Sequence, residues 1–540
     1  MPTPDQLRPR VETGKPEAPP LPDSPPVPRE LGKPADEMSL DVSAYAVDES
    51  APAELKAALP ALTKPFVGSK RSYEDLVNAA AAVTRFLQRE LGFYLGYAYL
   101  PEQEPANGVI RIAVLEGRLD EVILNWDDKL PIQRAVVEAY LARLKPGEIL
   151  RVRDVERIVF LVNDLRGITA RFEVKSGRQP GTASLVVSPQ PEQRIASRVE
   201  VDTHGSRFSG VVRASALATV ASPFGRGDGL VVNALTSTTS GLRFALLGYT
   251  MPVGADGLKL GASLSLVKYK LSQKELESQL DLHGDANTLT VYGLYPVIRS
   301  RNLNLFSLVS LDVKKFKDFQ AGVPSTKDVT DVQISGSGDA RDDLLTGGVS
   351  TYELSLVQGR QKGQPKNPDP ATFTMLRVNL TRLQNVINNR LLVYGAAKAQ
   401  FAFKNLVNTE QFQIGGPDRV RAYAPGEGTG DTGLVVSLEL RYLPTEETFG
   451  RIARELVFSA FFDAGTIRKR HDASKEIAAA PAETPFVNSR SLSGWGVGAI
   501  WDRPRDFSLR AYLAWPISGT AENDPQVKKP RIYATANKSF

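Results

Sequence analysis

The chain has 540 residues, of which 42% are hydrophobic and 24% charged, with 66 Lys and Arg against 61 Asp and Glu. No stretch approaches the roughly 18 consecutive apolar residues of a membrane-spanning helix, which excludes a helical membrane bundle. A transmembrane β-barrel is not excluded, because its alternating strands keep the mean hydropathy low. The absence of cysteine excludes disulfides and thiolate chemistry, and the evenly spread net charge of +5 does not indicate nucleic acid as a partner.

Residues 1–38 are rich in proline and charge, so we expect an extended segment that buries little apolar surface. No apolar leader region follows Met1, and under export this sequence would therefore be the mature form.

Residues 39–117 have the pattern of a small α+β domain. A capping box at Ser72 and Asp75 begins a helix, and one face of that helix is apolar. The apolar face consists of Leu76, Ala80, Val83 and Leu87. The other predicted elements are strands at 42–47, 97–100 and 109–115 and a short helix at 52–59.

Residues 118–190 repeat this order loosely. A strand is predicted at 119–124 and a helix at 132–144, and a second helix runs from Asp154 to a stop at Gly167. Strands at 168–174 and 183–187 close the unit.

Residues 191–540 read as strands of period two separated by polar turns. The predicted strands begin near 194, 209, 227, 240, 257, 286, 303, 328, 345, 372, 390, 432, 455, 491, 507 and 531. Sixteen strands fit a single-chain bacterial barrel, which has an even number of strands. About 22 residues are available for each strand with its connection, which is enough for a tilted membrane-spanning strand. Long connections alternate with short ones, as the outer loops and periplasmic turns of such a barrel do. We therefore predict a mixed fold of two small α+β domains followed by a 16-stranded antiparallel transmembrane β-barrel. A soluble β-sandwich would not explain the alternation of connection lengths.

Several motifs that suggest chemistry fail on their context. Gly428–Gly433 fits the dinucleotide fingerprint, but a strand follows it where a helix is needed. The three histidines, His204, His283 and His471, lie far apart, and Asp339, Asp342 and Asp343 are better explained as a solvated turn than as a cation site. No Ser/His/Asp set stands out. We therefore expect no catalytic residue, no cofactor and no metal, and we interpret the chain as a non-enzyme.

Two segments resemble motifs of a known superfamily. Residues 413–423, Gln-Ile-Gly-Gly-Pro-Asp-Arg-Val-Arg-Ala-Tyr, resemble the Val-Arg-Gly-Tyr/Phe lid-loop motif of outer-membrane barrels preceded by POTRA domains. Residues 461–465, Phe-Phe-Asp-Ala-Gly, resemble their Phe-x-Asp-x-Gly strand motif. Within that superfamily the chain resembles the two-partner secretion transporters (TpsB, haemolysin secretion/activation type), which have two POTRA domains before sixteen strands. The segments at 100–119 and 156–167 resemble the end of the first POTRA domain and a helix of the second.

The resemblance implies a Gram-negative outer-membrane transporter with its POTRA domains, 39–117 and 118–190, in the periplasm. It implies that these domains capture a secreted, β-helical partner exoprotein, which then threads through the barrel to the cell surface. The lipid bilayer is a further partner, as is the barrel-assembly machinery, for which Phe540 would be the signal. An alternative is an insertase for other outer-membrane barrels. A diffusion porin would leave residues 40–190 without a role.

The expected site is a lid loop at about 403–431 together with the barrel wall. Its motif residues are Gly415, Gly416, Val420, Arg421, Ala422 and Tyr423 in the loop, and Phe461, Asp463 and Gly465 in the wall. Strand parity turns Asp463 into the lumen, and the resemblance implies that Arg421 meets it there. Without the resemblance, the better interpretation would be that Arg421 lies in an external loop and that Asp463 is exposed to water in the lumen.

Ala422 replaces the usual glycine of the lid motif and fits only where φ is negative. An N-terminal plug helix is left open, since residues 1–38 are so rich in proline that only short pieces, such as residues 5–11, could be helical.

Overall fold

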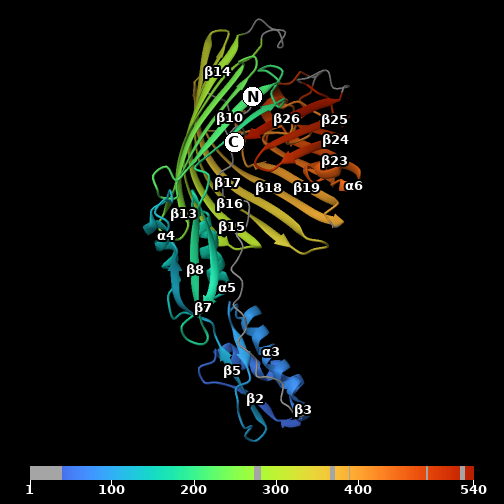
Figure 1. Ribbon diagram of the computed structural model, residues 1–540. Helices are drawn as coiled ribbons and strands as arrows, with labels where there is room; N and C mark the ends of the chain where they lie inside the picture. The colour runs from blue at the N-terminus through green and yellow to red at the C-terminus, as the bar shows by residue number, and fades with distance from the viewer. Residues whose placement is uncertain (1–38, 273–280, 365–370, 388, 482–484, 523–529) are drawn as a thin grey trace. The chain divides into compact units, whose positions relative to one another are not determined.

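The computed structural model describes residues 39–272, 281–364, 371–387, 389–481, 485–522 and 530–540 (Figure 1). The expectations for residues 1–38, the plug helix included, lie outside the described residues. The described chain divides into two compact units at Glu192 and Gln193. Among the described residues no helix has the length and apolar character needed to cross a membrane.

The first part of the N-terminal unit combines two helices with two small sheets. Strands β1 (Ser39–Val42) and β3 (Gly68–Ser72) pair, and β2 (Ala44–Val47), β5 (Val109–Leu115) and β4 (Tyr97–Tyr99) form a sheet in that order. The helices are α2 (Ala53–Thr63) and α3 (Tyr73–Arg89). The capping box of Ser72 and Asp75 is confirmed, and the predicted apolar residues of α3 lie in the core.

Three local predictions for this region were wrong. The strand predicted at 42–47 is two strands, because the N–H of Ser43 donates to the carbonyl of Gly108 (2.8 Å) and the chain changes partner there. Helix α2 runs to Thr63 through Pro60 instead of ending at residue 59. Strand β3 was missed, since its sequence is polar and it pairs with only one neighbour.

The second part repeats the α+β plan with one sheet in the order β6-β8-β7. Its elements are β6 (Arg118–Leu124), α4 (Arg134–Leu141), α5 (Val152–Asn163), β7 (Ile168–Ser176) and β8 (Thr182–Pro191). Helix α5 begins at Val152 rather than Asp154, since Arg151 occupies the N-cap. Gly167 follows the helix with φ 95°. On the surface, Arg178 donates to Asp120 (3.0 Å) and these hydrogen bonds lower the pKa of that carboxyl.

The C-terminal unit is a closed barrel of sixteen antiparallel strands, as predicted (Figure 1). Its strands are β9 (Ile195–Asp202), β10 (Arg213–Ala221), β11 (Gly229–Ser237), β12 (Leu242–Val253), β13 (Leu258–Lys270), β14 (Leu282–Arg299), β15 (Leu303–Gln320), β16 (Val323–Asp342), β17 (Gly348–Gln364), β18 (Thr372–Ile387), β19 (Leu391–Ala402), β22 (Thr432–Tyr442), β23 (Leu456–Arg468), β24 (Ser489–Arg503), β25 (Phe507–Ser518) and β26 (Arg531–Ser539). Strand β26 pairs with β9 and closes the cylinder.

Three predicted strand starts differ by four or five residues, at 209, 286 and 328. Strand β10 begins later, at Arg213, and β14 and β16 begin earlier, at Leu282 and Val323. The early parts of β14 and β16 are polar and were assigned to connections, although they stay in the ladder with β15.

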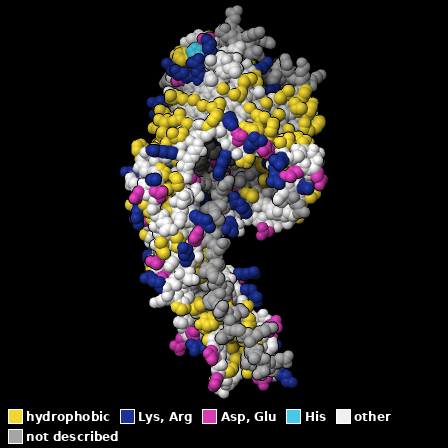
Figure 2. Space-filling view, in the orientation of Figure 1, with side chains coloured by type: hydrophobic (Ala, Val, Ile, Leu, Met, Phe, Trp, Pro, Cys, Tyr) yellow, Lys and Arg dark blue, Asp and Glu magenta, His cyan; other side chains and the backbone are white. Residues whose placement is uncertain are grey.

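The strands alternate between an outward apolar face and an inward polar face. On β13, Leu264 and Leu266 are 45% and 44% exposed on the outside, whereas Ser265 and Val267 are buried on the inside. Figure 2 shows the outward side chains as a belt of hydrophobic groups over the barrel. Only three residues separate the end of β8 from the start of β9, so the end of the barrel at Ile195 is the end joined to the N-terminal unit. We call it the near end and the opposite one the far end.

Candidate translocation site: a lid loop inside the barrel

The connection between β19 and β22, residues 403–431, starts from the far end and folds back into the barrel. Its two limbs are joined by the short strands β20 (Phe412–Gln413) and β21 (Thr429–Gly430). Two backbone hydrogen bonds continue the pairing, from Ile414 to Gly428 and from Val420 to Ile414, each 2.9 Å. Ile414 and Val420 are fully buried against inward-facing wall residues, among them Val435, Phe461 and Ile467.

Arg421 lies at the tip of this loop and contacts Asp463 of β23. Its Nε donates to Oδ2 of Asp463 (2.8 Å), its Nη2 to Oδ1 (2.9 Å), and its backbone N–H to Oδ2 (3.1 Å). The guanidinium also lies over the ring of Phe461, 3.3 Å from the ring centre. Asp463 has no exposed surface and Arg421 only 7%, so the fork-to-fork contact is a buried one.

A second carboxylate completes the charge balance at the tip. Nη1 of Arg421 donates to Oε2 of Glu439 on β22 (2.9 Å), and the other Glu439 oxygen accepts from Nε of Arg441 (2.9 Å). Two arginines thus face two carboxylates. This balance matters because removing one partner from a buried pair leaves an uncompensated charge.

The glycines of both motifs allow the loop to approach the wall closely. A Cβ on Gly465 would lie 3.0 Å from Ile414 and 3.1 Å from Val420, and one on Gly415 would lie 2.5 Å from the carbonyl of Ala424. Gly416 has φ 132°, a conformation that L side chains rarely adopt.

Ala422 fits because a glycine stands opposite it on the wall. Ala422 is absent from the described non-glycine residues with positive φ, so its backbone does not need glycine. A Cβ on Gly494 of β24 would lie 2.4 Å from the Cβ of Ala422, so the methyl group fills the space left there. Tyr423 follows, with its hydroxyl donating to the carbonyl of Ser518 (2.8 Å) and its own carbonyl accepting from Tyr533 (2.8 Å).

The first limb of the loop is anchored to a different wall by charges that the sequence analysis missed. Glu410 accepts from Lys314 of β15 (3.0 Å) and from Arg377 of β18 (3.2 Å), and Lys314 also contacts Asp331 of β16 (3.2 Å). Glu410, Lys314 and Asp331 are each 3% exposed. The loop therefore spans the lumen from β15 on one side to β23 on the other.

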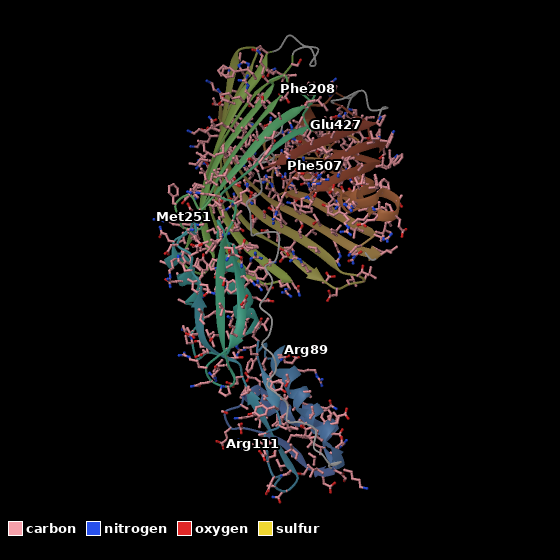
Figure 3. The ribbon with its side chains drawn as sticks, in the orientation of Figure 1. Arg89, Arg111, Phe208, Met251, Glu427 and Phe507 are labelled. Carbon is pink, nitrogen blue, oxygen red and sulfur yellow. The ribbon has the colours of Figure 1, made fainter. Side chains whose placement is uncertain are left out.

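The return limb has a third ionic anchor at Glu427, which is labelled in Figure 3 and fully buried. Arg490 of β24 donates to its Oε1 (2.6 Å) and also contacts Glu522 (3.0 Å). Glu427, Glu410, Lys314 and Glu439 carry no motif. The only sequence signal of these residues is that each is charged and lies either in the loop or at a strand position that faces the lumen.

The remaining candidates within the described residues make no direct contact with Arg421, although Tyr533, on which His204 packs, bonds the loop at Tyr423. His204 contacts Tyr533, His283 stacks on Phe319, and Asp342 pairs with Arg382 (2.8 Å). Within the described residues no three His, Asp or Glu side chains are grouped as a metal site would require. Phe540 is 62% exposed and its backbone pairs with Ser197 across the seam of the barrel (2.8 and 3.1 Å).

Comparison with known proteins identifies the family of this chain and shows solved structures with the same fold. The family model described as haemolysin secretion/activation protein ShlB/FhaC/HecB matches residues 181–498, and the ShlB-type POTRA model matches residues 41–117. The heme/hemopexin transporter protein HuxB of Haemophilus influenzae is 26% identical over 479 residues, covering 86% of this chain and 81% of HuxB. The outer membrane transporter CdiB of Dickeya dadantii is 23% identical, with the same coverage. The solved structure of CdiB from Escherichia coli superposes with a TM-score of 0.73 at 19% identity, covering 95% of this chain and 93% of that one.

Proposed function

Since the chain belongs to the haemolysin secretion/activation protein family of ShlB, FhaC and HecB, it carries a partner protein across the outer membrane, and we propose how it does so. The domains of residues 39–190 capture the partner in the periplasm as an extended chain. The partner then threads through the barrel after the lid loop leaves its place in the lumen. The step is passive, and folding of the partner at the cell surface gives it direction.

The partner is an exoprotein with a β-helical body and an N-terminal secretion segment. Relatives named as transporters of heme/hemopexin and of hemolysin support a dedicated secreted cargo. The barrel itself is inserted by the assembly machinery, with Phe540 as the recognised end. No chemical step by the chain is required.

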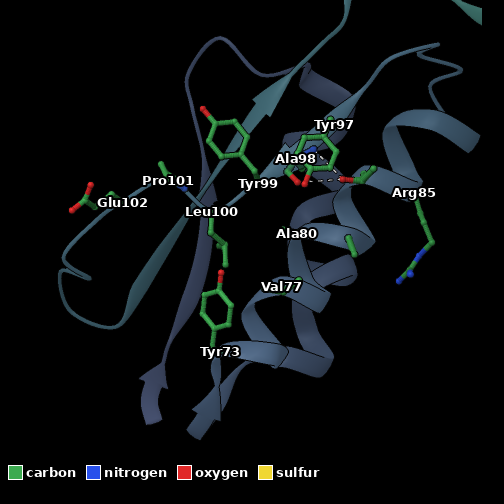
Figure 4. A pocket seen from close by; sticks show the side chains of 12 residues that line it. Tyr73, Val77, Ala80, Arg85, Tyr97, Ala98, Tyr99, Leu100, Pro101 and Glu102 are labelled. Carbon is green, nitrogen blue, oxygen red and sulfur yellow. Dashed lines mark hydrogen bonds between the residues drawn. The ribbon is translucent and has the colours of Figure 1, made fainter. Parts of the chain in front are cut away.

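The capture surface that we propose lies in the first domain, between α3 and the edge strand β4 (Figure 4). A groove of about 480 Å³ is lined there by apolar and aromatic side chains, including Tyr73, Val77, Tyr97 and Leu100. Strand β4 is the last strand of its sheet, and an extended segment can add to such an edge through backbone hydrogen bonds.

This edge is not entirely open. The N–H of Ala98 donates to Oγ1 of Thr84 (2.9 Å), the hydroxyl of Thr84 donates back to the carbonyl of Ala98 (3.4 Å), and Gln88 donates to the carbonyl of Gly96 (3.0 Å). An incoming strand must therefore displace two side chains of α3. We propose that Thr84 and Gln88 provide hydrogen-bond partners for the backbone groups of this edge until the partner protein binds.

The observation that carries the proposed gating is that Arg421 forms ion pairs with both Asp463 and Glu439 inside a closed barrel. Opening requires that this contact breaks, together with the anchors at Glu410 and Glu427. The three anchors lie on different strands, so the loop can leave the lumen in stages.

The test of capture is deletion of residues 40–188. We expect the partner protein to be absent from the medium while the barrel still reaches the outer membrane and keeps its heat-modifiable mobility on gels. Normal export of the partner would overturn capture by these domains. Normal export together with failed assembly of other outer-membrane barrels would favour the insertase function instead.

A further inference from the structure

The outward face of strands β12–β17 changes from apolar to basic toward the far end of the barrel. On β13, the exposed residues Leu264 and Leu266 are followed on the same face by Lys268 and Lys270. Exposed Leu311 of β15 and Leu356 of β17 are likewise followed on the same face by cations, lysines on β15 and an arginine and a lysine on β17. We define the basic rim as the seven outward cations Arg243, Lys268, Lys270, Lys315, Lys317, Arg360 and Lys362, whose side chains are all exposed.

The strand register brings cations of the rim side by side. Arg243 of β12 lies directly opposite Lys268 of β13, at a cross-strand spacing of about 5 Å. Across β14, Lys268 and Lys317 are both register partners of Asp285. Like charges that face each other directly destabilise a sheet, so an anion bound beside Arg243 and Lys268 would stabilise this part of the barrel.

Carboxylates of the chain compensate only part of this charge. Asp328 lies between Lys315 and Lys362 in the register, and Asp281 is 3.8 Å from Lys270, so with Asp285 three carboxylates accompany seven cations. Among the described residues, no carboxylate lies within ion-pair distance of Arg243 or Lys268. The rim therefore keeps a net positive charge, and within the described chain Arg243 and Lys268 share only the register neighbour Asp285 as a nearby anion.

The rim lies on one wall at the edge of the apolar belt, whereas on another wall the described residues of β23 include the single outward cation Arg468, opposite Ser489. Figure 2 shows Lys and Arg side chains gathered above the hydrophobic belt, over the strands that carry the label β14 in Figure 1. On another wall, β24 presents Ser489, Ser491 and Ser493 in the corresponding outward positions. The far end is the extracellular end, because the near end continues into the periplasmic domains. The rim thus lies at the level of the outer-leaflet headgroups.

We propose that the basic rim binds a phosphorylated glycolipid of the outer leaflet, with Arg243 and Lys268 flanking one phosphate and Lys315 and Lys317 lying beside a second. The acyl chains of such a lipid would run along Leu264 and Leu266 directly below. Long basic side chains at the edge of an apolar belt are well suited to this, since their stems cover apolar surface while the charge reaches the headgroup. The rim faces away from the lumen, so a chain that threads through the barrel does not meet it.

The test is lipid binding by the full-length protein in neutral detergent. Wild type and the double variant Arg243→Gln/Lys268→Gln are titrated with bisphosphorylated lipid A and with its dephosphorylated form, and bound lipid is counted by native mass spectrometry. We expect wild type to prefer the phosphorylated lipid at least tenfold and the variant to lose that preference. A double variant of two exposed cations of the second domain, Lys129→Gln/Lys145→Gln, is the matched control and should bind like wild type.

A gain-of-binding variant guards against misfolding as an explanation. Asp285→Asn removes the carboxylate between Lys268 and Lys317 and should tighten binding of lipid A two- to fivefold. Equal binding of the two lipids by wild type, or unchanged binding by both rim variants, would overturn the proposal. So would full competition by inorganic phosphate, which would make the rim a general anion site. If the double variant keeps its lipid but exports less partner protein, the surface serves the exoprotein and the lipid assignment is wrong.

Discussion

Arg421 uses its whole guanidinium group and its backbone N–H at the loop tip. Two nitrogens and the main chain bind Asp463, the third nitrogen binds Glu439, and the flat face covers Phe461. A lysine has one point charge and no flat face, so it cannot replace this set of contacts. The loop tip is therefore specified by geometry as well as by charge.

The first prediction follows from this seat. Arg421→Ala should leave Asp463 buried without its partner and cost about 3–5 kcal/mol of loop-seating free energy. A loop without this contact no longer has a defined position from which to leave the lumen in stages, so we expect strongly reduced secretion at nearly normal barrel levels, measured as partner protein in the medium per inserted barrel. Asp463→Ala should behave alike.

The double variant of these residues provides the control for the pairing. Because both single changes remove the same contact, the double variant should be little worse than either single one. Fully additive defects would show that the two residues act separately.

A second prediction concerns the close approach of Ala422 and Gly494. Gly494→Ala should push the loop tip from the wall, since the new Cβ would lie 2.4 Å from that of Ala422. We expect a fall in secretion and a lower unfolding temperature, and a partial rescue by Ala422→Gly in the same chain. The rescue is partial because the carbonyl of Trp515 is also only 2.9 Å from the new atom.

Gly395→Ala is the matched control, because nothing lies within 4 Å of a Cβ at that position of β19. Equal effects of the two glycine changes would contradict the role given to the close approach.

How far the sequence predicts the site differs from residue to residue. Asp463 could be placed in the lumen because it alternates with the apolar Phe462 and Ala464. Its contact with Arg421, 42 positions away, came from the resemblance, since no local pattern links a loop to a strand. Glu439 was missed, although it lies between the outward Leu438 and Leu440 and its inward parity was readable.

At the scale of elements, strand existence was predictable and strand ends were not. Alternation identifies a strand wherever one face meets lipid, which holds for the middle of each barrel strand. Beyond the belt both faces are polar, as at the start of β16, and the ladder continues without any hydrophobic signal. The break between β1 and β2 was invisible for a different reason, because pairing with two different strands decides it.

The third prediction belongs to strand β4 and helix α3. Thr84→Val keeps the shape of the side chain but removes the hydroxyl that binds both backbone groups of Ala98. An added strand would no longer have to displace it, so the affinity for the partner's secretion segment should rise severalfold, measured by calorimetry. Val77→Glu, in the lining of the groove, should lower that affinity.

Unchanged affinity in Thr84→Val, together with a loss in Val77→Glu, would mean that the groove binds side chains and that the strand edge is not used. Unchanged affinity in both variants would remove the groove from the capture surface.

For the whole molecule, the end of the chain lies at the place where the barrel closes. Phe540 is exposed on the lipid side and its N–H and carbonyl both pair with Ser197. Its removal takes away an aromatic end and two backbone hydrogen bonds of the seam. The fourth prediction is that deleting Phe540 lowers the amount of inserted barrel more than the secretion per inserted molecule.

Phe540→Tyr should insert like wild type, because the ring and both backbone bonds remain. Membrane fractions quantified by immunoblot separate the two effects. Unchanged membrane levels after the deletion would argue against Phe540 as an assembly signal.

The pairing between β26 and β9, the seam of the barrel, has a consequence for where the barrel opens locally. Its ladder pairs Thr535–Ser539 with Asp202–Arg198 and is extended by backbone hydrogen bonds between Phe540 and Ser197 and between Thr203 and Ala534, whereas the ladder between β15 and β16 covers the whole of β15. Fewer ladder bonds mean a smaller free energy of local opening. In deuterated buffer those amides of residues 198–202 and 535–539 that point across the seam should therefore exchange well before the amides of residues 303–320. The slowest-exchanging part of the cylinder is the wall of long strands, and the fastest is the joint between its first and last strand.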